Sequence, residues 1–135
     1  MVTGNIEQPI GVFDSGVGGL TVLKALKHRL PFEDFLYLGD TARLPYGTKS
    51  AQSITRYALQ AAKLLVERHI KLLVIACNTA SSVALPALHQ LFQPLPIIGV
   101  IAPGASASCK ASVSGGIAVI ATESTVRQGA YHDAI

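Results

Sequence analysis

Five short apolar runs, each followed by a turn and a stretch of helical spacing, constrain the fold more than any other feature. The runs cover residues 10–13, 35–38, 71–76, 96–101 and 116–121. Apart from Lys71 at the start of the third run, they are apolar and do not alternate with polar residues, which predicts strands that are buried on both faces. Such alternation of strand and helix is typical of an open, mainly parallel sheet with right-handed crossovers. We therefore predict a three-layer α/β/α domain.

The segments between the runs have the spacing of amphipathic helices. Leucines recur every three or four positions in residues 20–30, and Pro31 predicts the end of that helix. Ser50 or Ser53 is placed to cap a longer helix that continues to His69. We expect further helices over 79–92, with an interruption at Pro86, over 105–112 and over 123–135.

The composition excludes two broad classes of protein. Only 14% of the 135 residues are charged, against about 25% in a typical soluble domain, which excludes a disordered chain. The longest apolar runs, such as 72–77, are far shorter than the about 20 residues of a membrane span, so we expect no membrane segment. The length is that of one domain with a core of its own.

Charge and cysteine content indicate which partners and which cell compartment to expect. The net charge is +3, and the Lys and Arg residues are scattered without aromatic neighbours, so we predict no nucleic-acid partner. Two cysteines, Cys77 and Cys109, are too few for a disulfide scaffold. The first residues have no basic region followed by a long apolar run, so we expect no signal peptide and a reducing cytoplasm.

Reactive side chains gather where the predicted strands end. Ligands of open α/β sheets bind outside the carboxyl ends of the strands, and free N–H groups at strand-to-helix turns favour a carboxylate there. The residues that follow the five runs include a thiol, carboxylates, an amide and several hydroxyls. They are Asp14 and Ser15, Asp40 with Tyr46 and Gly47, Cys77 with Asn78 and Thr79, Ala102 to Gly104, and Thr122 to Thr125.

Cys77 is the sharpest candidate among these residues. It stands between a buried strand and a helix start, where the helix dipole favours a thiolate. An inert core cysteine is the competing interpretation, but the polar neighbours at the strand ends favour function. Asp14, Ser15 and Asp40 are also good capping residues, and Pro45-Tyr46-Gly47 is also a plausible turn, so their roles stay open at this point.

Other chemistries find little support in the chain. The four histidines fall within or at the ends of predicted helices, and no Cys or His pair has ligand spacing, so we predict no metal. Lysines lie outside the strand-end turns apart from Lys49, which argues against a Schiff-base cofactor. A dinucleotide fold is the remaining rival, but Thr21 replaces the last glycine of its fingerprint and Cys77 stays unexplained. Cys109 lies in a predicted helix and is expected to be structural.

Three motifs in order resemble the aspartate/glutamate racemase superfamily, and within it the glutamate racemases. They are DSGVGGLT at 14–21, GDTARLPYG at 39–47 and ACNTAS at 76–81, and the resemblance continues through ATESTVRQGAY at 121–131. The PYG element favours the glutamate enzymes over their aspartate and hydantoin relatives. The resemblance implies cofactor-independent interconversion of L- and D-glutamate, which supplies D-glutamate for peptidoglycan synthesis. In this family two cysteines face opposite sides of the substrate Cα, one removing and one delivering a proton.

The resemblance also implies roles for individual residues. Cys77 resembles the first acid/base cysteine of the family. The residues that resemble the family's substrate contacts are Asp14 and Ser15 in the first turn, Tyr46 and Gly47 at the side-chain carboxylate, Asn78 and Thr79 at the α-carbon end, and Thr122. Inversion at Cα needs two proton carriers within hydrogen-bond reach, and fixed electrostatic help for the developing carbanion.

The second family cysteine, in a Cys-Thr-His motif, has no counterpart in this chain. Family members are about twice as long and consist of two similar α/β domains, so residues 1–135 are expected to be the N-terminal racemase domain without its C-terminal domain. We expect this fragment alone to be inactive. A non-catalytic dicarboxylate-binding module and an aspartate racemase-like enzyme are the alternatives.

The stretch from 72 to 122 holds one formally charged residue, Lys110. An uncharged helix over 79–92 is unusual on a free surface. We therefore expect part of this stretch to contact the second domain or the other subunit of a homodimer.

Overall fold

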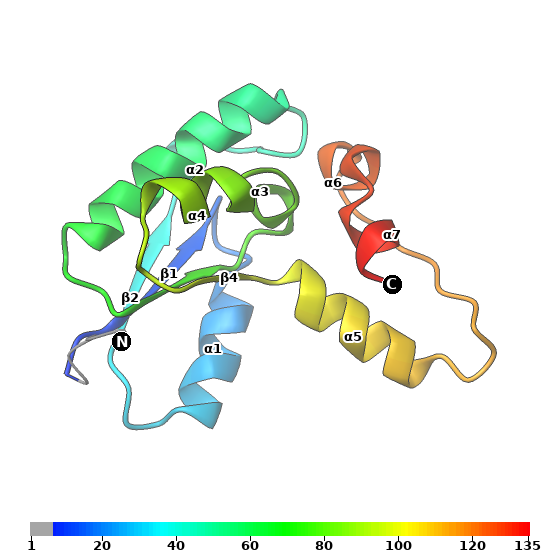
Figure 1. Ribbon diagram of the computed structural model, residues 1–135, viewed down its shortest axis with the longest axis horizontal. Helices are drawn as coiled ribbons and strands as arrows, with labels where there is room; N and C mark the ends of the chain where they lie inside the picture. The colour runs from blue at the N-terminus through cyan, green and yellow to red at the C-terminus, as the bar shows by residue number, and fades with distance from the viewer. Residues whose placement is uncertain (1–6) are drawn as a thin grey trace.

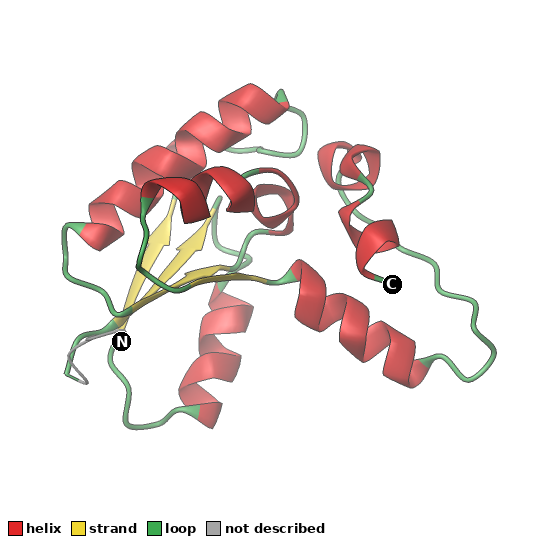
Figure 2. Ribbon diagram, in the orientation of Figure 1, coloured by secondary structure: helices red, strands yellow, loops and turns green. Residues whose placement is uncertain are grey.

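The computed structural model describes residues 7–135 and has a four-stranded parallel sheet with helices on both faces (Figures 1 and 2). The strand order is β2-β1-β3-β4, so β1 and β3 are the central strands. The strands are β1 (Ile10–Asp14), β2 (Phe35–Gly39), β3 (Leu72–Ile75) and β4 (Ile97–Gly99). The helices are α1 (Leu20–Arg29), α2 (Ala51–Val66), α3 (Asn78–Val83), α4 (Leu85–Leu91), α5 (Ile101–Ala111), α6 (Glu123–Gln128) and α7 (Ala130–Ala134), with a 3₁₀ turn η1 (Thr41–Arg43). The predicted α/β class and parallel sheet are confirmed.

The strand register brings the ends of the strands level. Asp14 pairs with Gly39 of β2, Phe13 pairs with Ile75 of β3, and Ile75 pairs with Gly99 of β4. The loops that follow β1, β2 and β3 therefore leave the sheet side by side. We call this side of the sheet, at Asp14, Gly39 and Ile75, the carboxyl edge.

Helices on opposite faces of the sheet cover its central strands (Figure 1). Alternate residues of β1 and β3, such as Val12 and Val74, pack against α1 on one face. Phe13, Leu73 and Ile75 point to the other face and join the larger core with α2 and α4. These three side chains are fully buried, which stabilises the fold by about 1.5–3 kcal/mol each.

Helix α2 has the apolar stripe and the cap that its sequence predicts. The Ser50 Oγ accepts a hydrogen bond from the Ser53 N–H at 3.2 Å, so Ser50 is the N-cap. All four predicted apolar positions are buried, namely Ile54, Ala58, Ala61 and Leu65. Ala62 is buried as well. The helix ends at Val66 rather than His69, and His69 adopts a left-handed φ of 57° that no helix continues through.

Proline and glycine set the boundaries of the later helices. The interruption expected at Pro86 falls at Ala84, where α3 ends and α4 begins with Pro86 in its first turn. Helix α5 starts at Ile101 and not at 105, so Ala102 to Gly104 belong to its first turn instead of forming a strand-end loop. Gly129, with φ of 67°, separates α6 from α7 within the predicted single helix over 123–135.

The predicted fifth strand over 116–121 is wrong. This segment has no regular secondary structure and pairs with no strand among the described residues, 7–135. Helix α5 leads away from the sheet, and residues 112–122 return at a distance from β4 (Figure 1). The edge strand β4 is consequently covered on one face only, and Ile98 is 49% exposed.

The uncharged helix over 79–92 is explained partly within the chain itself. Ala80, Ala84 and Leu88 are buried in the larger core, against α2 and the sheet. Leu91 remains 61% exposed. The contact of this exposed part with another domain or subunit stays a prediction. Within residues 7–135, none of the helices has the length and apolar character to cross a membrane.

Gly39 offers a direct test of the close packing at the carboxyl edge. A Cβ at this position would lie 2.2 Å from the Gly16 carbonyl oxygen, which is backbone and cannot turn aside. We expect Gly39→Ala to lower the free energy of unfolding by about 1–3 kcal/mol. The control is Gly18→Ala, where the nearest atom is an Asp14 carboxylate oxygen at 4.0 Å, and a change under about 0.5 kcal/mol is expected. Urea unfolding of both variants measures the difference, and equal stabilities would contradict the packing argument.

Candidate active site at the carboxyl edge

Cys77 connects β3 to α3 and faces the loop that follows β1. Its Sγ accepts a hydrogen bond from the Ala80 N–H at 3.4 Å, so the cysteine is the N-cap of α3. The thiol donates to the Ser15 Oγ at 3.3 Å. Cys77 is 6% exposed, so most of the thiol is enclosed by protein. The structure thus brings together the thiol and the hydroxyl that the strand-end argument placed at one edge.

Asp14 holds the glycine-rich turn after β1. Its Oδ2 accepts a hydrogen bond from the Gly16 N–H at 2.9 Å, and the carboxylate is buried. The Tyr37 hydroxyl donates to the Gly16 carbonyl oxygen at 2.9 Å. Burial, followed by the nearby Asp14 charge, raises the pKa of Tyr37 to about 12, so the hydroxyl stays a neutral donor at physiological pH. Asp14 therefore caps its own turn, which is the competing role that the sequence left open.

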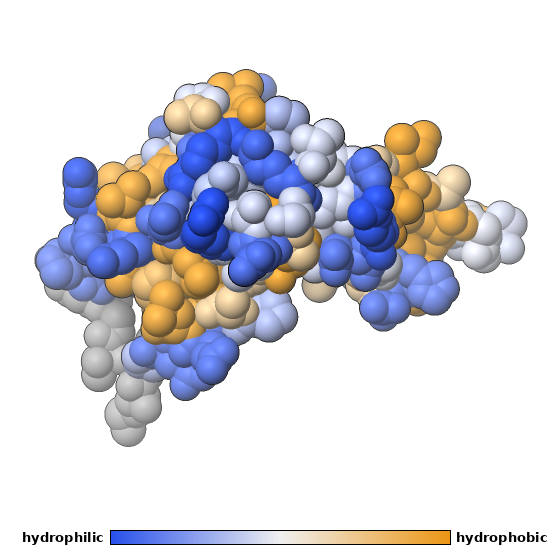
Figure 3. Space-filling view, turned by 90° about the horizontal axis from the view of Figure 1, so that it is seen from above, coloured by the Kyte–Doolittle hydropathy of each residue, from blue (hydrophilic) through white to orange (hydrophobic). Residues whose placement is uncertain are grey.

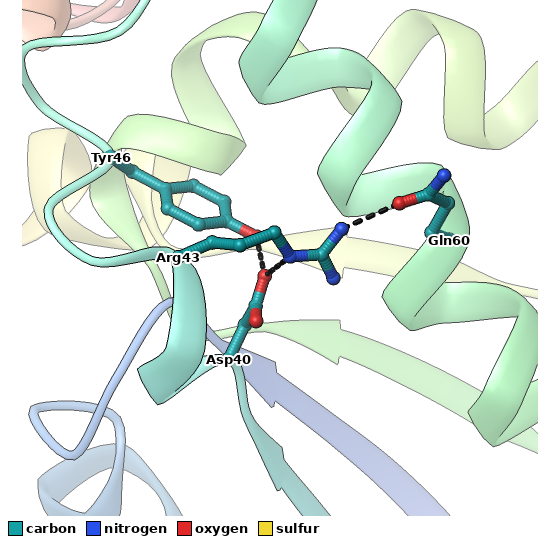
Figure 4. A network of polar contacts seen from close by, with 4 residues as sticks. All are labelled: Asp40, Arg43, Tyr46 and Gln60. Atoms are coloured by element: carbon teal, nitrogen blue, oxygen red, sulfur yellow. Dashed lines mark hydrogen bonds and ion pairs between the residues drawn. The ribbon is translucent and has the colours of Figure 1, made fainter.

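Tyr46 is fixed in the core by a polar network (Figure 4). Its hydroxyl donates to Asp40 Oδ2 at 2.5 Å, and Arg43 Nε pairs with the same oxygen at 2.6 Å. Arg43 Nη1 also donates to Gln60 Oε1 of α2 at 2.5 Å. Burial, and then the hydrogen bond to Asp40, raise the pKa of Tyr46 well above its usual range. The Tyr46 ring packs in the core, so its side chain supports the loop after β2 and does not extend from the carboxyl edge.

Gly47 brings the loop after β2 into contact with the start of α6. Its carbonyl oxygen accepts the Ser124 N–H at 3.2 Å. A Cβ at Gly47 would lie 2.5 Å from the Thr122 Cβ. The missing side chain at Gly47 is therefore what allows Thr122 to approach the loop.

Three threonine hydroxyls join α3 to α6. Thr79 Oγ1 and Thr122 Oγ1 are 2.9 Å apart, Thr122 and Thr125 are 3.0 Å apart, and Thr125 donates to Thr79 at 3.4 Å. Thr79 and Thr125 are buried. Because a hydroxyl both donates and accepts, each of the three groups can donate to the next, and turning a hydrogen toward a ligand would break one of these hydrogen bonds.

Asn78 is the exposed polar residue beside Cys77. Its Oδ1 accepts a hydrogen bond from the hydroxyl of Tyr131 on α7 at 2.7 Å. A cavity of about 450 Å³ opens beside these two side chains, and Thr122 and Thr125 also border it. The first turn of α3 thus carries a thiol, an amide and a hydroxyl in succession.

The structure places the predicted residues in three connected groups. Cys77 contacts Ser15, Thr79 contacts Thr122, and Gly47 contacts α6. Cys109, expected to be structural, lies exposed on α5 and outside the core. Within residues 7–135 no three His, Cys, Asp or Glu side chains lie close enough together to hold a metal ion.

Sequence reasoning missed several residues that support the site. Arg43 and Gln60 hold Asp40 and its loop, Tyr37 holds Gly16, and Tyr131 holds Asn78. Arg43 stands three positions after Asp40, a spacing that suggests an ion pair in a tight turn. Tyr131 and Asn78 are 53 residues apart, so no local sequence pattern predicts their contact.

The carboxyl edge has one thiol, that of Cys77, with Ser15 and the first turn of α3 beside it. A thiol can carry a proton to or from a carbon acid, and nearby amide and hydroxyl groups can hold a carboxylate. The same edge holds no second thiol among the described residues, because Cys109 lies on the exposed surface of α5. One thiol with an amide and hydroxyl groups beside it is therefore what this edge can offer for such chemistry.

The chain is similar to known proteins over most of its length. The chain is 58% identical to a glutamate racemase of Geobacter metallireducens over 126 residues, which are 93% of this chain and 46% of that protein. A glutamate racemase isoform of Bacillus anthracis superposes with a TM-score of 0.92 at 41% identity, over 96% of this chain and 48% of that one. The Francisella tularensis glutamate racemase, solved in complex with D-glutamate, superposes with a TM-score of 0.84 at 44% identity, over 93% and 47% of the two chains.

The chain spans about half the length of these curated relatives. The family model described as Asp/Glu/Hydantoin racemase matches residues 10–135, which include every residue of the carboxyl edge discussed above. The chain therefore belongs to the Asp/Glu/Hydantoin racemase family.

Proposed function

We propose that this chain supplies one half of a glutamate racemase, which interconverts L- and D-glutamate without a cofactor and provides D-glutamate for peptidoglycan synthesis. The observation that carries the proposal is Cys77, placed between β3 and α3 with Ser15 and Asn78 beside it. The identity to named glutamate racemases supports the substrate. Two free cysteines fit a reducing compartment, and we place the enzyme in the cytoplasm.

The proposed reaction uses Cys77 on one side of the substrate Cα. In one direction its thiolate removes the α-proton, and in the other direction its thiol returns a proton to the same face. The Ser15 hydroxyl, 3.3 Å from Sγ, orients the sulphur toward the substrate. Inversion needs a second proton carrier on the opposite face, which we assign to a cysteine outside these 135 residues.

The surrounding groups have separable tasks in this proposal. Asn78 and Thr79, in the first turn of α3, hold the α-carboxylate with side-chain donors and backbone N–H groups. Asp14 keeps the turn of Ser15 in place and faces the α-ammonium group. Thr122 and the backbone at Gly47 bind the side-chain carboxylate, while the Tyr46 side chain fixes that loop through Asp40.

The exposed apolar surface near the C-terminal segments supports a packing partner. Val113 and Ile120 are almost fully exposed, and Val119 and Val126 are 42% and 57% exposed. Apolar side chains gather at the end of the molecule that carries these segments (Figure 3). Exposed apolar patches of this kind mark contact surfaces. We propose that the second racemase domain covers residues 113–126, and that the complete enzyme assembles as a homodimer.

Racemisation should require both halves of the enzyme and Cys77. We expect the isolated 135-residue chain to show no appreciable racemisation, because one carrier cannot invert Cα. In the complete gene product, Cys77→Ala should lower the rate by about 10²–10⁴-fold. The matched control, Cys109→Ala, removes the exposed thiol and should retain activity. The circular dichroism signal of D-glutamate measures the rate.

Three outcomes would contradict the proposal. Inversion by the isolated chain would show that a second carrier is not needed. Calorimetric binding of D- and L-glutamate that survives Cys77→Ser, without turnover in the complete gene product, would favour a non-catalytic dicarboxylate-binding module. Faster inversion of aspartate than of glutamate would favour an aspartate racemase-like enzyme.

Hydrogen exchange tests the proposed domain contact. The backbone amides of residues 117–121 lie in a segment without regular structure and should exchange rapidly in the isolated chain. In the complete gene product they should be protected, because the second domain covers them. The amides of β1, at the centre of the sheet, serve as the control and should be protected in both proteins. Rapid exchange at 117–121 in both proteins would place the second domain elsewhere.

A further inference from the structure

Tyr131 makes a contact with the proposed site that its place in the sequence does not suggest. It lies on α7, and its hydroxyl donates to Oδ1 of Asn78 at 2.7 Å across 53 residues of chain. Asn78 is exposed, whereas Tyr131 is half-buried. One end of the exposed amide is thus anchored by a hydroxyl from a more enclosed ring.

The polarity of this hydrogen bond determines what the amide offers to a ligand. An asparagine amide has an oxygen that only accepts and an NH₂ group that only donates. With Oδ1 engaged by the tyrosine hydroxyl, the NH₂ group is the end that remains for a ligand. A carboxylate needs donors, and an amide turned the other way would present its oxygen and repel the ligand.

A second observation shows that space for the tyrosine ring is built into the fold. A Cβ at Gly104 of α5 would lie 3.0 Å from the Tyr131 hydroxyl oxygen and 3.2 Å from Cε1. These contacts are tighter than ordinary van der Waals contact, so any side chain at Gly104 would push the ring. Gly104 and Tyr131 also border the cavity of about 450 Å³ that Asn78 faces.

We infer that Tyr131 is a positioning residue, which orients the Asn78 amide so that its NH₂ group faces the α-carboxylate of the substrate. The inference rests on the proposed racemase function, since it assigns the ligand of Asn78 to that substrate. Tyr131 itself touches neither the substrate nor the reacting atoms. Its effect on binding passes through Asn78, and that route makes the inference testable.

The test uses the complete gene product with Tyr131→Phe, which removes the hydroxyl and keeps the ring. Because a hydrogen bond in a partly exposed setting has a modest net effect, we expect KM for glutamate to rise about three- to tenfold, with kcat changed by less than about twofold. The matched control is Tyr57→Phe on α2, which deletes the same atom elsewhere and should leave KM unchanged. Thermal unfolding confirms that both variants fold.

A double-mutant cycle separates positioning from a merely structural role. If Tyr131 acts through Asn78, then Tyr131→Phe should have no further effect on KM in an Asn78→Ala background. Gly104→Ala should raise KM in the same direction as Tyr131→Phe, because the added methyl group displaces the ring. Equal effects of Tyr131→Phe with and without Asn78, or no effect in either, would overturn the inference.

Binding measured without turnover keeps the inference distinct from the proposed function. The same variants are titrated with D-glutamate by calorimetry, and Kd should follow the pattern expected for KM. If the unsubstituted protein binds D-glutamate but does not racemise it, the proposed function fails, and the coupling in Kd still decides the role of Tyr131. If the unsubstituted protein does not bind glutamate, the proposed function and the inferred role of Tyr131 are both wrong.

Discussion

The level register of three parallel strands is the constraint on which the site depends. Asp14 pairs with Gly39 at the ends of β1 and β2, and Ile75 ends β3 opposite Phe13, one residue earlier. Three loops that are far apart in the chain therefore start from one edge, and the thiol after β3 comes within 3.3 Å of the hydroxyl after β1. A shift of one residue would send every side chain of the moved strand to the opposite face. The buried pairs Val12–Val74 and Phe13–Ile75 hold the register against such a shift.

The loop after β2 is held in place by a network of polar side chains that bind one another. Asp40 receives both the Tyr46 hydroxyl and the Arg43 guanidinium, and Arg43 continues to Gln60 on α2. Asp40 is buried while Arg43 is partly exposed, so separating the two would leave the Asp40 carboxylate buried with one partner fewer, and the network therefore resists local rearrangement. The loop it fixes meets α6 through Gly47. A rigid loop loses little entropy when a ligand binds, which favours tight positioning of a small substrate.

How much the sequence predicts depends on the range of the interaction. Four strands, the α2 stripe and the Ser50 cap follow from local patterns, and they are correct. Cys77 and Ser15 could be brought together because parallel strands end at one edge. The failures need information from elsewhere in the fold. The Tyr46 hydroxyl donates to a carboxylate six residues earlier, which the turn pattern does not predict, and the contact of Tyr46 with a substrate stays a prediction. The contact of Tyr131 with Asn78 depends on how α5 and α7 pack, which no local pattern encodes.

The incorrectly predicted strand at 116–121 and the single thiol at the carboxyl edge are both explained by the proposed second domain. Residues 116–121 have the composition of a buried strand, yet a strand forms only where another strand supplies its hydrogen bonds. Here α5 carries the segment away from β4 (Figure 1). Val119 and Ile120 are left exposed, Ile120 almost completely. Burying them would stabilise the protein by about 25 cal/mol per Å² of apolar surface. In the proposed reaction Cys77 likewise needs a second thiol, which the described residues do not place at the carboxyl edge. A second domain packed on residues 113–126 would satisfy both demands at once, because it would bring its own strand to the exposed segment and its own proton carrier to the open side of Cys77.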